Sequence, residues 1–250
     1  MKKIRKYYDM YLTNEKQKHR SLLGSYNTRK WNDASPLVYF EKIYGGKPLL
    51  KKIKSIGLET DINFHSAMIQ ENMAGHWIAS GWSEINRLNV MSLDLRKYKF
   101  EKLNTSHIED FNLNTIEKLL PLDHSIFDSY WRNSKAGFIE TIESCNRNYL
   151  FKKYSDENLI GYAILGTTRN FSFLQRFGIS KEHQNEGHGS SLLEDVISFA
   201  KNKKLVNIRL NTQSSNNAAK KLYLNKGFKR VFTLNRYLVN KLLCFLFIPF

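Results

Sequence analysis

Residues 171–189 read FSFLQRFGISKEHQNEGHG, and this stretch decides the fold. Its first part, Phe171–Ile179, is predominantly apolar and predicts a strand. A helix is expected from Gly189, because apolar residues recur at helical spacing as far as Ala200. The first amides of a helix lack internal partners, and glycine permits close approach, so this turn can bind a phosphate group. A structural turn explains the two glycines nearly as well.

The segments around this stretch predict a sheet with helices. The expected elements are strands Leu150–Tyr154 and Leu159–Leu165 in a hairpin, helix Gly189–Lys203, strand Val206–Asn211, helix Asn216–Asn225 and strand Phe228–Val239. Hairpin strands followed by strand–helix–strand units are typical of a mixed α/β sheet.

A second unit is expected to open near Tyr98. We expect a strand at 99–103, then Ser106 as the cap of a helix, then helical sequence through Trp131. The predicted domains are therefore an N-terminal α/β region, residues 1–97, and a C-terminal domain, residues 98–250.

The N-terminal region also alternates between helix and strand. The expected elements are one or two helices before residue 35, strand Leu37–Phe40, a turn at 44–48, a helix at Ser66–Ser80 and strand Trp82–Leu95. Aligning Gly81-Trp82 on Gly227-Phe228 places Trp77 opposite Tyr223. This similarity fits a degenerate half-copy of the C-terminal domain, and an unrelated cap is the alternative.

Composition excludes several classes of protein. An apolar fraction of 42% and an aromatic fraction of 13% are typical of a globular chain. The two cysteines, Cys145 and Cys244, form no metal or disulfide pattern, so a reducing cytoplasm is the expected location. The net charge of +16 would suit a polyanionic partner, but the lysines are spread along the chain, so we expect no specific nucleic acid partner.

Neither end of the chain predicts a transmembrane segment. The basic start runs into polar, tyrosine-rich sequence and does not resemble a signal peptide. The apolar tail Leu242–Phe250 is far shorter than the roughly 20 residues that a membrane helix needs. It could complete a core or a homodimer contact, and a peripheral membrane foot is the alternative.

Two spaced motifs resemble those of the GCN5-related N-acetyltransferase (GNAT) superfamily. Gln184-x-x-Gly187-x-Gly189 fits the pattern Q/R-x-x-G-x-G/A, and Asn216 to Phe228 fits the second motif. The resemblance covers about Tyr98 to Leu238, and Leu174-Gln175-Arg176 looks most like a bacterial subgroup often found in actinobacteria. It implies a mixed, mostly antiparallel central sheet flanked by helices, with residues 1–97 as an N-terminal α/β extension.

The resemblance also implies an acetyl-CoA site without a metal. The backbone of the strand end would bind the pantetheine arm, the glycine turn would hold the pyrophosphate, and the next helix would add one contact. The implied residues are Phe177, Gly178, Ile179, Gln184, Asn185, Glu186, Gly187, His188, Gly189, Ser190 and Asn216.

Tyr223 is the candidate general acid. It lies two helical turns after Asn216, on nearly the same face. A phenol with a reference pKa of about 10 can protonate a thiolate near 8.5 at a cost of about 2 kcal/mol. A packed core aromatic is the alternative. No general base is identified, because Asn211 occupies the position of a glutamate found in related N-terminal acetylases, and neither Glu182 nor His183 is a good substitute.

Asp123, Phe127 and Trp131 are the candidate acceptor-binding residues. Their spacing of four places an acid and two aromatics on one helical face, although such a stripe is more often core. The predicted function is an acetyl-CoA-dependent N-acetyltransferase in which a primary amine of a small molecule or peptide attacks the thioester directly. A non-catalytic acyl-CoA-binding module and a basic protein of nucleic acid or membrane surfaces are the alternatives.

Overall fold

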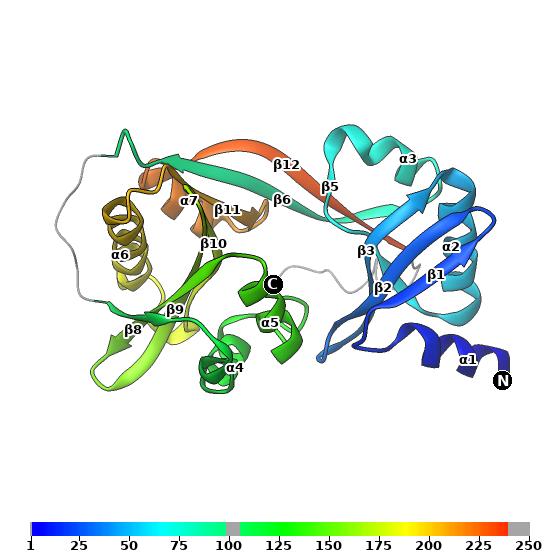
Figure 1. Ribbon diagram of the computed structural model, residues 1–250, viewed down its shortest axis with the longest axis horizontal. Helices are drawn as coiled ribbons and strands as arrows, with labels where there is room; N and C mark the ends of the chain where they lie inside the picture. Colours follow the sequence, from blue (N-terminus) through cyan, green and yellow to red (C-terminus); the bar gives the residue numbers. More distant parts are fainter. Residues whose placement is uncertain (1, 99–105, 240–250) are drawn as a thin grey trace. The chain divides into compact units, whose positions relative to one another are not determined.

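The computed structural model describes residues 2–98 and 106–239, which fall into two compact units (Figure 1). Unit 1 comprises Met1–Arg87 and Thr233–Phe250, and unit 2 comprises Leu88–Phe232. This division differs from the predicted limits of 97 and 98. The predicted strand at 99–103, Cys244 and the tail Leu242–Phe250 lie outside the described residues.

Unit 2 is built on a mixed sheet. Its strands, in spatial order, are β6 (Ser83–Asp94), β11 (Asn207–Gln213), β10 (Phe171–Ile179), β9 (Asn158–Thr168), β8 (Arg147–Ser155) and β7 (His107–Asp110). β10 and β11 run parallel, and the other neighbouring pairs run antiparallel. The predicted fold class, a mostly antiparallel mixed sheet with helices, is confirmed.

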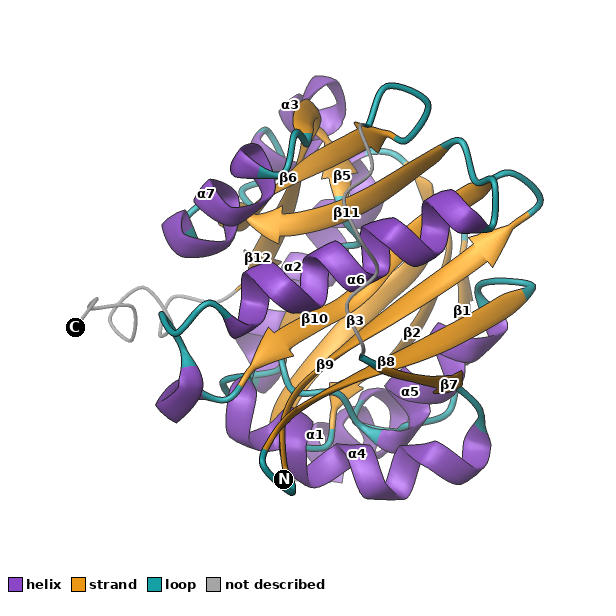
Figure 2. Ribbon diagram, turned by 90° about the vertical axis from the view of Figure 1, so that its left-hand side faces the viewer, coloured by secondary structure: helices purple, strands orange, loops and turns teal. Residues whose placement is uncertain are grey.

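Helices cover both faces of this sheet. Alternate residues of β9 point to opposite faces: Ala163 packs with α6 (His188–Asn202), while Tyr162 packs with α4 (Leu113–Ile126) and α5 (Lys135–Glu143). α7 (Asn217–Asn225) joins the α6 side through Tyr223. Figure 2 shows α6 lying across the strands. The bounds of β10, the hairpin β8–β9 and the helices α6 and α7 confirm the predictions for this part of the chain.

The start of α4 differs from the prediction. Ser106 precedes β7 and donates a hydrogen bond to Asp195, so it caps no helix. α4 instead begins at Leu113, after β7 has ended at Asp110. Its N-cap is Asn112, whose side chain accepts a hydrogen bond from the amide of Asn114 at 2.9 Å. The helix also ends at Ile126 and does not reach Trp131, because Phe127 is extended.

Unit 1 contains the remaining strands. Its strands, in order, are β1 (Gln17–Ser21), β2 (Gly24–Asn32), β3 (Ser35–Gly45), β4 (Asn63–His65) and β12 (Lys229–Val239), and β5 (Ile69–Gln70) also pairs with β12. The helices are α1 (Lys2–Tyr11), α2 (Lys47–Thr60) and α3 (Ala74–Ile78).

One prediction for unit 1 is confirmed and two are wrong in detail. The expected one or two helices before residue 35 are the single helix α1, after which the chain forms the hairpin β1–β2 with Tyr26 and Thr28 buried on one face. The expected turn at 44–48 is the junction of β3 and α2. Pro48 lies in the first turn of α2, where its missing amide hydrogen costs no helical hydrogen bond. The expected helix Ser66–Ser80 is divided into β5, a 3₁₀ turn and the short α3.

The predicted alignment of the two regions has a structural counterpart. Gly81 and Gly227 have φ values of 81° and 85°. The amide of Trp82 donates to the carbonyl of Trp77 at 3.1 Å, and the amide of Phe228 donates to that of Tyr223 at 3.0 Å. Both helices therefore end in the same Schellman turn. A parallel strand pair joined by a helix also precedes each turn, namely β3–α2–β4 and β10–α6–β11.

The last strand of each repeat belongs largely to the sheet of the other. Residues Leu88–Asp94 of β6 pair with β11 in unit 2. Residues Leu238 and Val239 of β12 pair with β4 in unit 1. Each sheet is thus completed by a strand from the opposite half of the sequence.

Candidate functional site

The strands β10 and β11 separate where the sequence predicts the thioester site. Their parallel pairing covers Phe171–Leu174 and Asn207–Leu210 only. β10 nevertheless stays paired with β9 as far as Ile179. Among the described residues, no strand pairs with the edge of residues 175–179 that faces away from β9, and the amides and carbonyls of this edge can bind an extended ligand.

A β-bulge in β10 assigns its side chains to the two faces of the sheet. The register shifts between Leu174 and Arg176, so Gln175 and Arg176 both point to the side of α4 and α5. Gln175 donates to the carbonyl of Thr141 in α5 at 3.0 Å. Phe177 points to the opposite side, where its ring contacts Tyr223.

The glycine turn after β10 is open at the start of α6. Gly187 has a φ of 86° and precedes the helix without a side-chain cap. A Cβ added to Gly187 would meet nothing within 4 Å, and one on Gly189 would come no closer than 3.7 Å to Ile179. The helix's first internal bond runs from the amide of Ser191 to Gly187 at 3.0 Å, which leaves the amides of residues 188–190 for a ligand.

Side chains hold this turn against the strand. Gln184 donates from Nε2 to the carbonyl of Ile179 at 3.0 Å. Asn185 has a φ of 66°, and Oε2 of Glu186 lies 3.3 Å from Nε2 of His188. The turn therefore starts from a fixed point at the end of β10.

Tyr223 lies beside the separating strands. It is 5% exposed, and its ring centroid is 6.1 Å from that of Phe177. Its hydroxyl makes no hydrogen bond with the residues that the structure describes. Burial raises the pKa of Tyr223, so the phenol keeps its proton at neutral pH.

Asn216 has a structural role in the helix that carries Tyr223. Its Oδ1 accepts a bond from the amide of Ala219 at 3.0 Å and caps α7. The predicted cofactor contact from Asn216 would therefore have to come from its Nδ2. Asn211 is exposed on β11 and offers no carboxylate, while the Nδ1 of His183 lies 2.9 Å from Ser180 Oγ.

The three predicted acceptor residues meet, but through an arginine rather than a helical face. Arg176 donates from Nε to Asp123 at 2.8 Å and from Nη2 to the carbonyl of Trp131 at 2.6 Å. Its guanidinium carbon lies 3.6 Å from the centre of the Phe127 ring. Arg176 was not predicted as a site residue, although the sequence shows it as a charge inside an apolar strand and as part of the subgroup resemblance at Leu174-Gln175-Arg176.

Asp123 is not open to an acceptor amine. Its side chain is fully buried and forms an ion pair with Arg176 at 2.6 Å. Its Oδ1 accepts from the amide of Asn133 at 2.8 Å, and its Oδ2 also accepts from the hydroxyl of Tyr162. These donors replace the cationic amine that the sequence suggested, because a buried carboxylate needs its partners within the fold.

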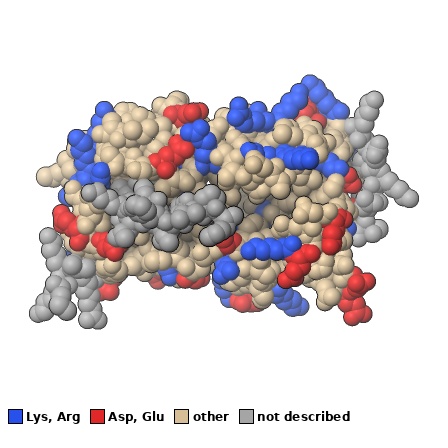
Figure 3. Space-filling view, turned by 180° about the vertical axis from the view of Figure 1, so that it is seen from behind, with Lys and Arg blue, Asp and Glu red and all other residues tan. Residues whose placement is uncertain are grey.

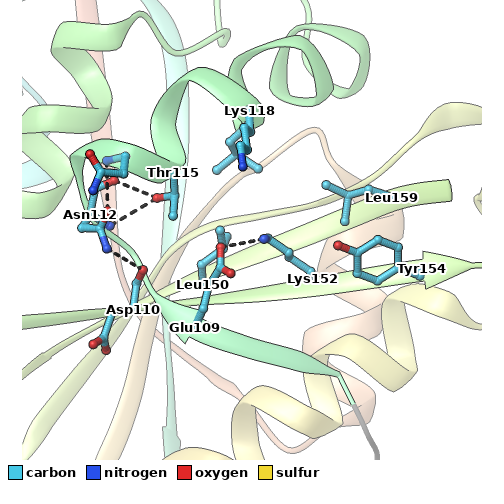
Figure 4. Close-up of a pocket in the computed structure, with 11 residues that line it drawn as sticks. Glu109, Asp110, Asn112, Thr115, Lys118, Leu150, Lys152, Tyr154 and Leu159 are labelled. Atoms are coloured by element: carbon cyan, nitrogen blue, oxygen red, sulfur yellow. Dashed lines mark hydrogen bonds and ion pairs between the residues drawn. The ribbon is translucent and has the colours of Figure 1, made fainter. Parts of the chain in front are cut away.

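A separate pocket of about 420 Å³ lies between β7, the first half of α4 and the β8–β9 hairpin (Figure 4). Leu119, Leu150 and Leu159 are among its apolar lining, and Lys152 pairs with Glu109 at 2.6 Å at its side. No residue of the predicted cofactor or acceptor sites lines it.

On the face shown in Figure 3, Lys and Arg lie at many separate places with Asp and Glu among them. Within residues 2–98 and 106–239, no three His, Cys, Asp or Glu side chains cluster as metal ligands would. No helix in this described part has the length and apolar character needed to cross a bilayer.

Comparisons with known proteins place these features in context. The family model for the acetyltransferase (GNAT) family matches residues 114–228. Streptothricin acetyltransferase of Escherichia coli is 29% identical over 95 residues, which are 38% of this chain and 55% of that protein. The match thus spans about half the length of that relative.

Solved structures resemble a larger part of the chain. A tandem GNAT protein from the clavulanic acid biosynthesis pathway has a TM-score of 0.63 at 14% identity, over 94% of this chain and 86% of that one. A GCN5-related N-acetyltransferase from Sphaerobacter thermophilus has a TM-score of 0.58 at 12% identity, over 86% of this chain and 76% of that one. At such identities the likeness concerns the fold, which is a tandem arrangement in the first case.

Proposed function

We propose that this chain, which carries a domain of the GNAT family at residues 114–228, moves an acetyl group from acetyl-CoA to a primary amine. The observation that carries the proposal is the separation of β10 from β11 next to an uncapped glycine turn. An unpaired strand edge suits an extended amide-bearing arm, and free helix amides suit a pyrophosphate.

The substrate-binding groups follow from this arrangement. The amides at residues 188–190, with Gln184 holding the turn, would bind the pyrophosphate of acetyl-CoA. The backbone of Phe177, Gly178 and Ile179 would bind the pantetheine arm. An amide of this strand would also stabilise negative charge on the thioester oxygen during attack.

Tyr223 would supply the proton that the departing thiolate needs. The amine nitrogen forms a bond to the acyl carbon, the carbon–sulfur bond breaks, and the phenol protonates the sulfur. The nitrogen loses one proton to water, and the phenolate of Tyr223 is reprotonated from water. Burial raises the pKa of the phenol, and the same low-dielectric surroundings raise the pKa of a thiol. The free energy of proton transfer from the phenol to the thiolate therefore stays within a few kcal/mol of zero. Its unengaged hydroxyl favours this role over packing alone.

The amine must lose a proton without help from a carboxylate on β11. Asn211 stands in the position considered for a base and is exposed. We therefore propose that the acceptor amine loses its proton to the solvent before binding and enters the site in its neutral form. The same asparagine supports the second candidate, a module that binds acyl-CoA without turnover.

Thiol release from acetyl-CoA with a panel of primary amines tests the proposal. The panel should include streptothricin, because of the similarity to streptothricin acetyltransferase, together with diamines, amino acid amides and short peptides. We expect release that depends on the amine and falls in Tyr223→Phe, with CoA binding retained. CoA binding without release for any amine would favour the non-catalytic module.

A further inference from the structure

Arg176 has donors that the fold leaves unused. Its Nε and Nη2 bind Asp123, and Nη2 also binds the carbonyl of Trp131. An arginine carries five N–H donors, two of them on Nη1. Nη1 makes no hydrogen bond with the described residues, and the side chain remains 14% exposed. A charged donor of Arg176 is therefore without a partner among the described residues.

This donor lies close to the strand segment proposed to face the thioester. Arg176 directly precedes Phe177. The ring of Phe127 is a shared neighbour, because the guanidinium carbon lies 3.6 Å from its centre and a Cβ on Gly178 would lie 3.1 Å from its Cζ. The guanidinium, the ring and the Gly178 backbone thus adjoin one another on the α4 side of β10.

The charge of the cluster selects the kind of group that Nη1 can bind. Asp123 neutralises Arg176, and its carboxylate is already bound by Tyr162 and by the amide of Asn133. A second carboxylate would leave the buried cluster with a net negative charge, and an ammonium group would be repelled by the guanidinium. A neutral carbonyl oxygen accepts from a charged N–H without either cost.

We propose that Nη1 of Arg176 binds a carbonyl oxygen of the acceptor, so that the acceptor is an aminoacyl compound, a primary amine next to an amide or ester. This inference rests on the proposed function and names the substrate class of the same site. Phe127 and the backbone of Trp131 hold the guanidinium in place. Arg176 therefore determines which acceptor is bound and takes no part in the bond changes.

Three matched amines test the assignment. Cadaverine, lysine and lysinamide share one diamine skeleton and differ in carrying no oxygen, a carboxylate or a neutral carbonyl. We expect kcat/KM for lysinamide to exceed that for cadaverine by about 10- to 100-fold, the range of one hydrogen bond to a charged group. Lysine should fall below lysinamide, and KM for acetyl-CoA should be the same with all three.

Variants separate recognition by Arg176 from the different basicities of the amines. Arg176→Lys keeps a charge beside Asp123 but lacks the fork, and Arg176→Met with Asp123→Asn removes both charges together. In either protein the ratio of kcat/KM for lysinamide to kcat/KM for cadaverine should fall to the value that the different basicities of the two amines set. Arg132→Lys, whose parent side chain donates to the carbonyl of Phe127 at 3.1 Å, is the matched control and should keep it.

Each outcome decides the question. A preference that persists in folded Arg176 variants, or equal use of cadaverine and lysinamide by the unaltered protein, would overturn the assignment while the acetyltransferase proposal stands. Lysine as the best of the three would overturn the neutral carbonyl. CoA binding without release for any amine would overturn the proposed function and this inference with it.

Discussion

Units 1 and 2 share a framework and differ at two points where chemistry would take place. Both place a Schellman turn after a helix, with Trp77 in one and Tyr223 in the other at the same position. Between β10 and α6 unit 2 has the turn of residues 180–187, whereas Gly46 alone separates β3 from α2 in unit 1. Helix capping and strand pairing are thus common to both units, while a turn and one hydroxyl distinguish the proposed active copy.

The strand–helix junction shows this difference most clearly. Gly46 is the N-cap of α2; Pro48 lacks an amide hydrogen in the first turn of that helix, and the amide of Leu49 already donates to the carbonyl of Gly46 at 3.1 Å. The corresponding Gly187 faces open space. Unit 1 thus closes the place where unit 2 leaves amides free.

Substituting the two equivalent aromatics gives the largest expected contrast. Tyr223→Phe removes the proposed proton donor and should lower kcat by about 10²- to 10⁴-fold, the range of general acid catalysis. Trp77→Phe should lower the melting temperature and leave kcat unchanged, because Trp77 lies in the core of unit 1. Steady-state thiol release and thermal unfolding measure both. Equal losses of kcat would contradict the division of roles.

Acid should destabilise unit 1 before unit 2. Burial, and then the charge of Arg236, lower the pKa of His65 to about 3. The unfolded chain binds a proton near its reference pKa of about 6.5, so stability is present above that pH and falls by roughly 3 kcal/mol between pH 6.5 and 4. Amide hydrogen exchange of β4 against β9 would report it, and His65→Gln should remove the dependence. If the protection of β4, corrected for the intrinsic pH dependence of amide exchange, did not change with pH, the assignment would be contradicted.

Alanine at two junction glycines compares the open turn with the closed one. Gly187→Ala strains a φ of 86° and adds a methyl group to the proposed phosphate site, so KM for acetyl-CoA should rise about tenfold. Gly46→Ala, at a φ of −91° with only Pro48 at 3.6 Å, should leave KM unchanged. A rise of KM in both proteins would show that the effect is not specific to unit 2.

The pH profile of turnover tests the missing base. With no carboxylate at Asn211, kcat/KM for an alkyl amine should rise about tenfold per pH unit from 6 to 9, since only the neutral amine reacts. Burial raises the pKa of Tyr223, so no fall from its ionisation is expected in that range. A plateau near neutrality would indicate a base within the protein.

The two Schellman turns should respond alike, with the smallest effect. Gly81→Ala and Gly227→Ala each force a side chain to adopt a φ above 80° and should cost about 1 kcal/mol of unfolding free energy. Denaturant unfolding of each variant measures this loss. Losses that differ by much more than the experimental error would break the structural equivalence of the two turns.

Local signals in the sequence predicted the parts of the fold that depend on them. β10, α6, α7 and the Gly227 turn follow from apolar spacing and glycine placement within a few residues. Ser106 misled because a short edge strand separates it from α4, whose cap is Asn112. The apolar residues Met68 and Ile69 suggested a helix, but β5 uses part of that segment to pair with β12.

The sequence could suggest only those parts of the candidate site that belong to short, continuous motifs. The glycine turn and Tyr223 belong to motifs with fixed spacing. The meeting of Asp123, Phe127 and Trp131 at Arg176 depends on a bulge in β10 and on the end of α4, and neither has a local signature. The compact units likewise have no local signature in the sequence, since β6 and β12 each run from one unit into the other.

The exchange of last strands bears on how such a chain can evolve. Residues Leu88–Asp94 belong to the first repeat but complete the sheet that carries the proposed site. A gene that lost the first repeat would leave β11 with a bare edge, prone to pair with other chains. The first repeat thus supplies the strand that covers this edge, so the sheet of the second repeat depends on residues 88–94 whatever else the first repeat does.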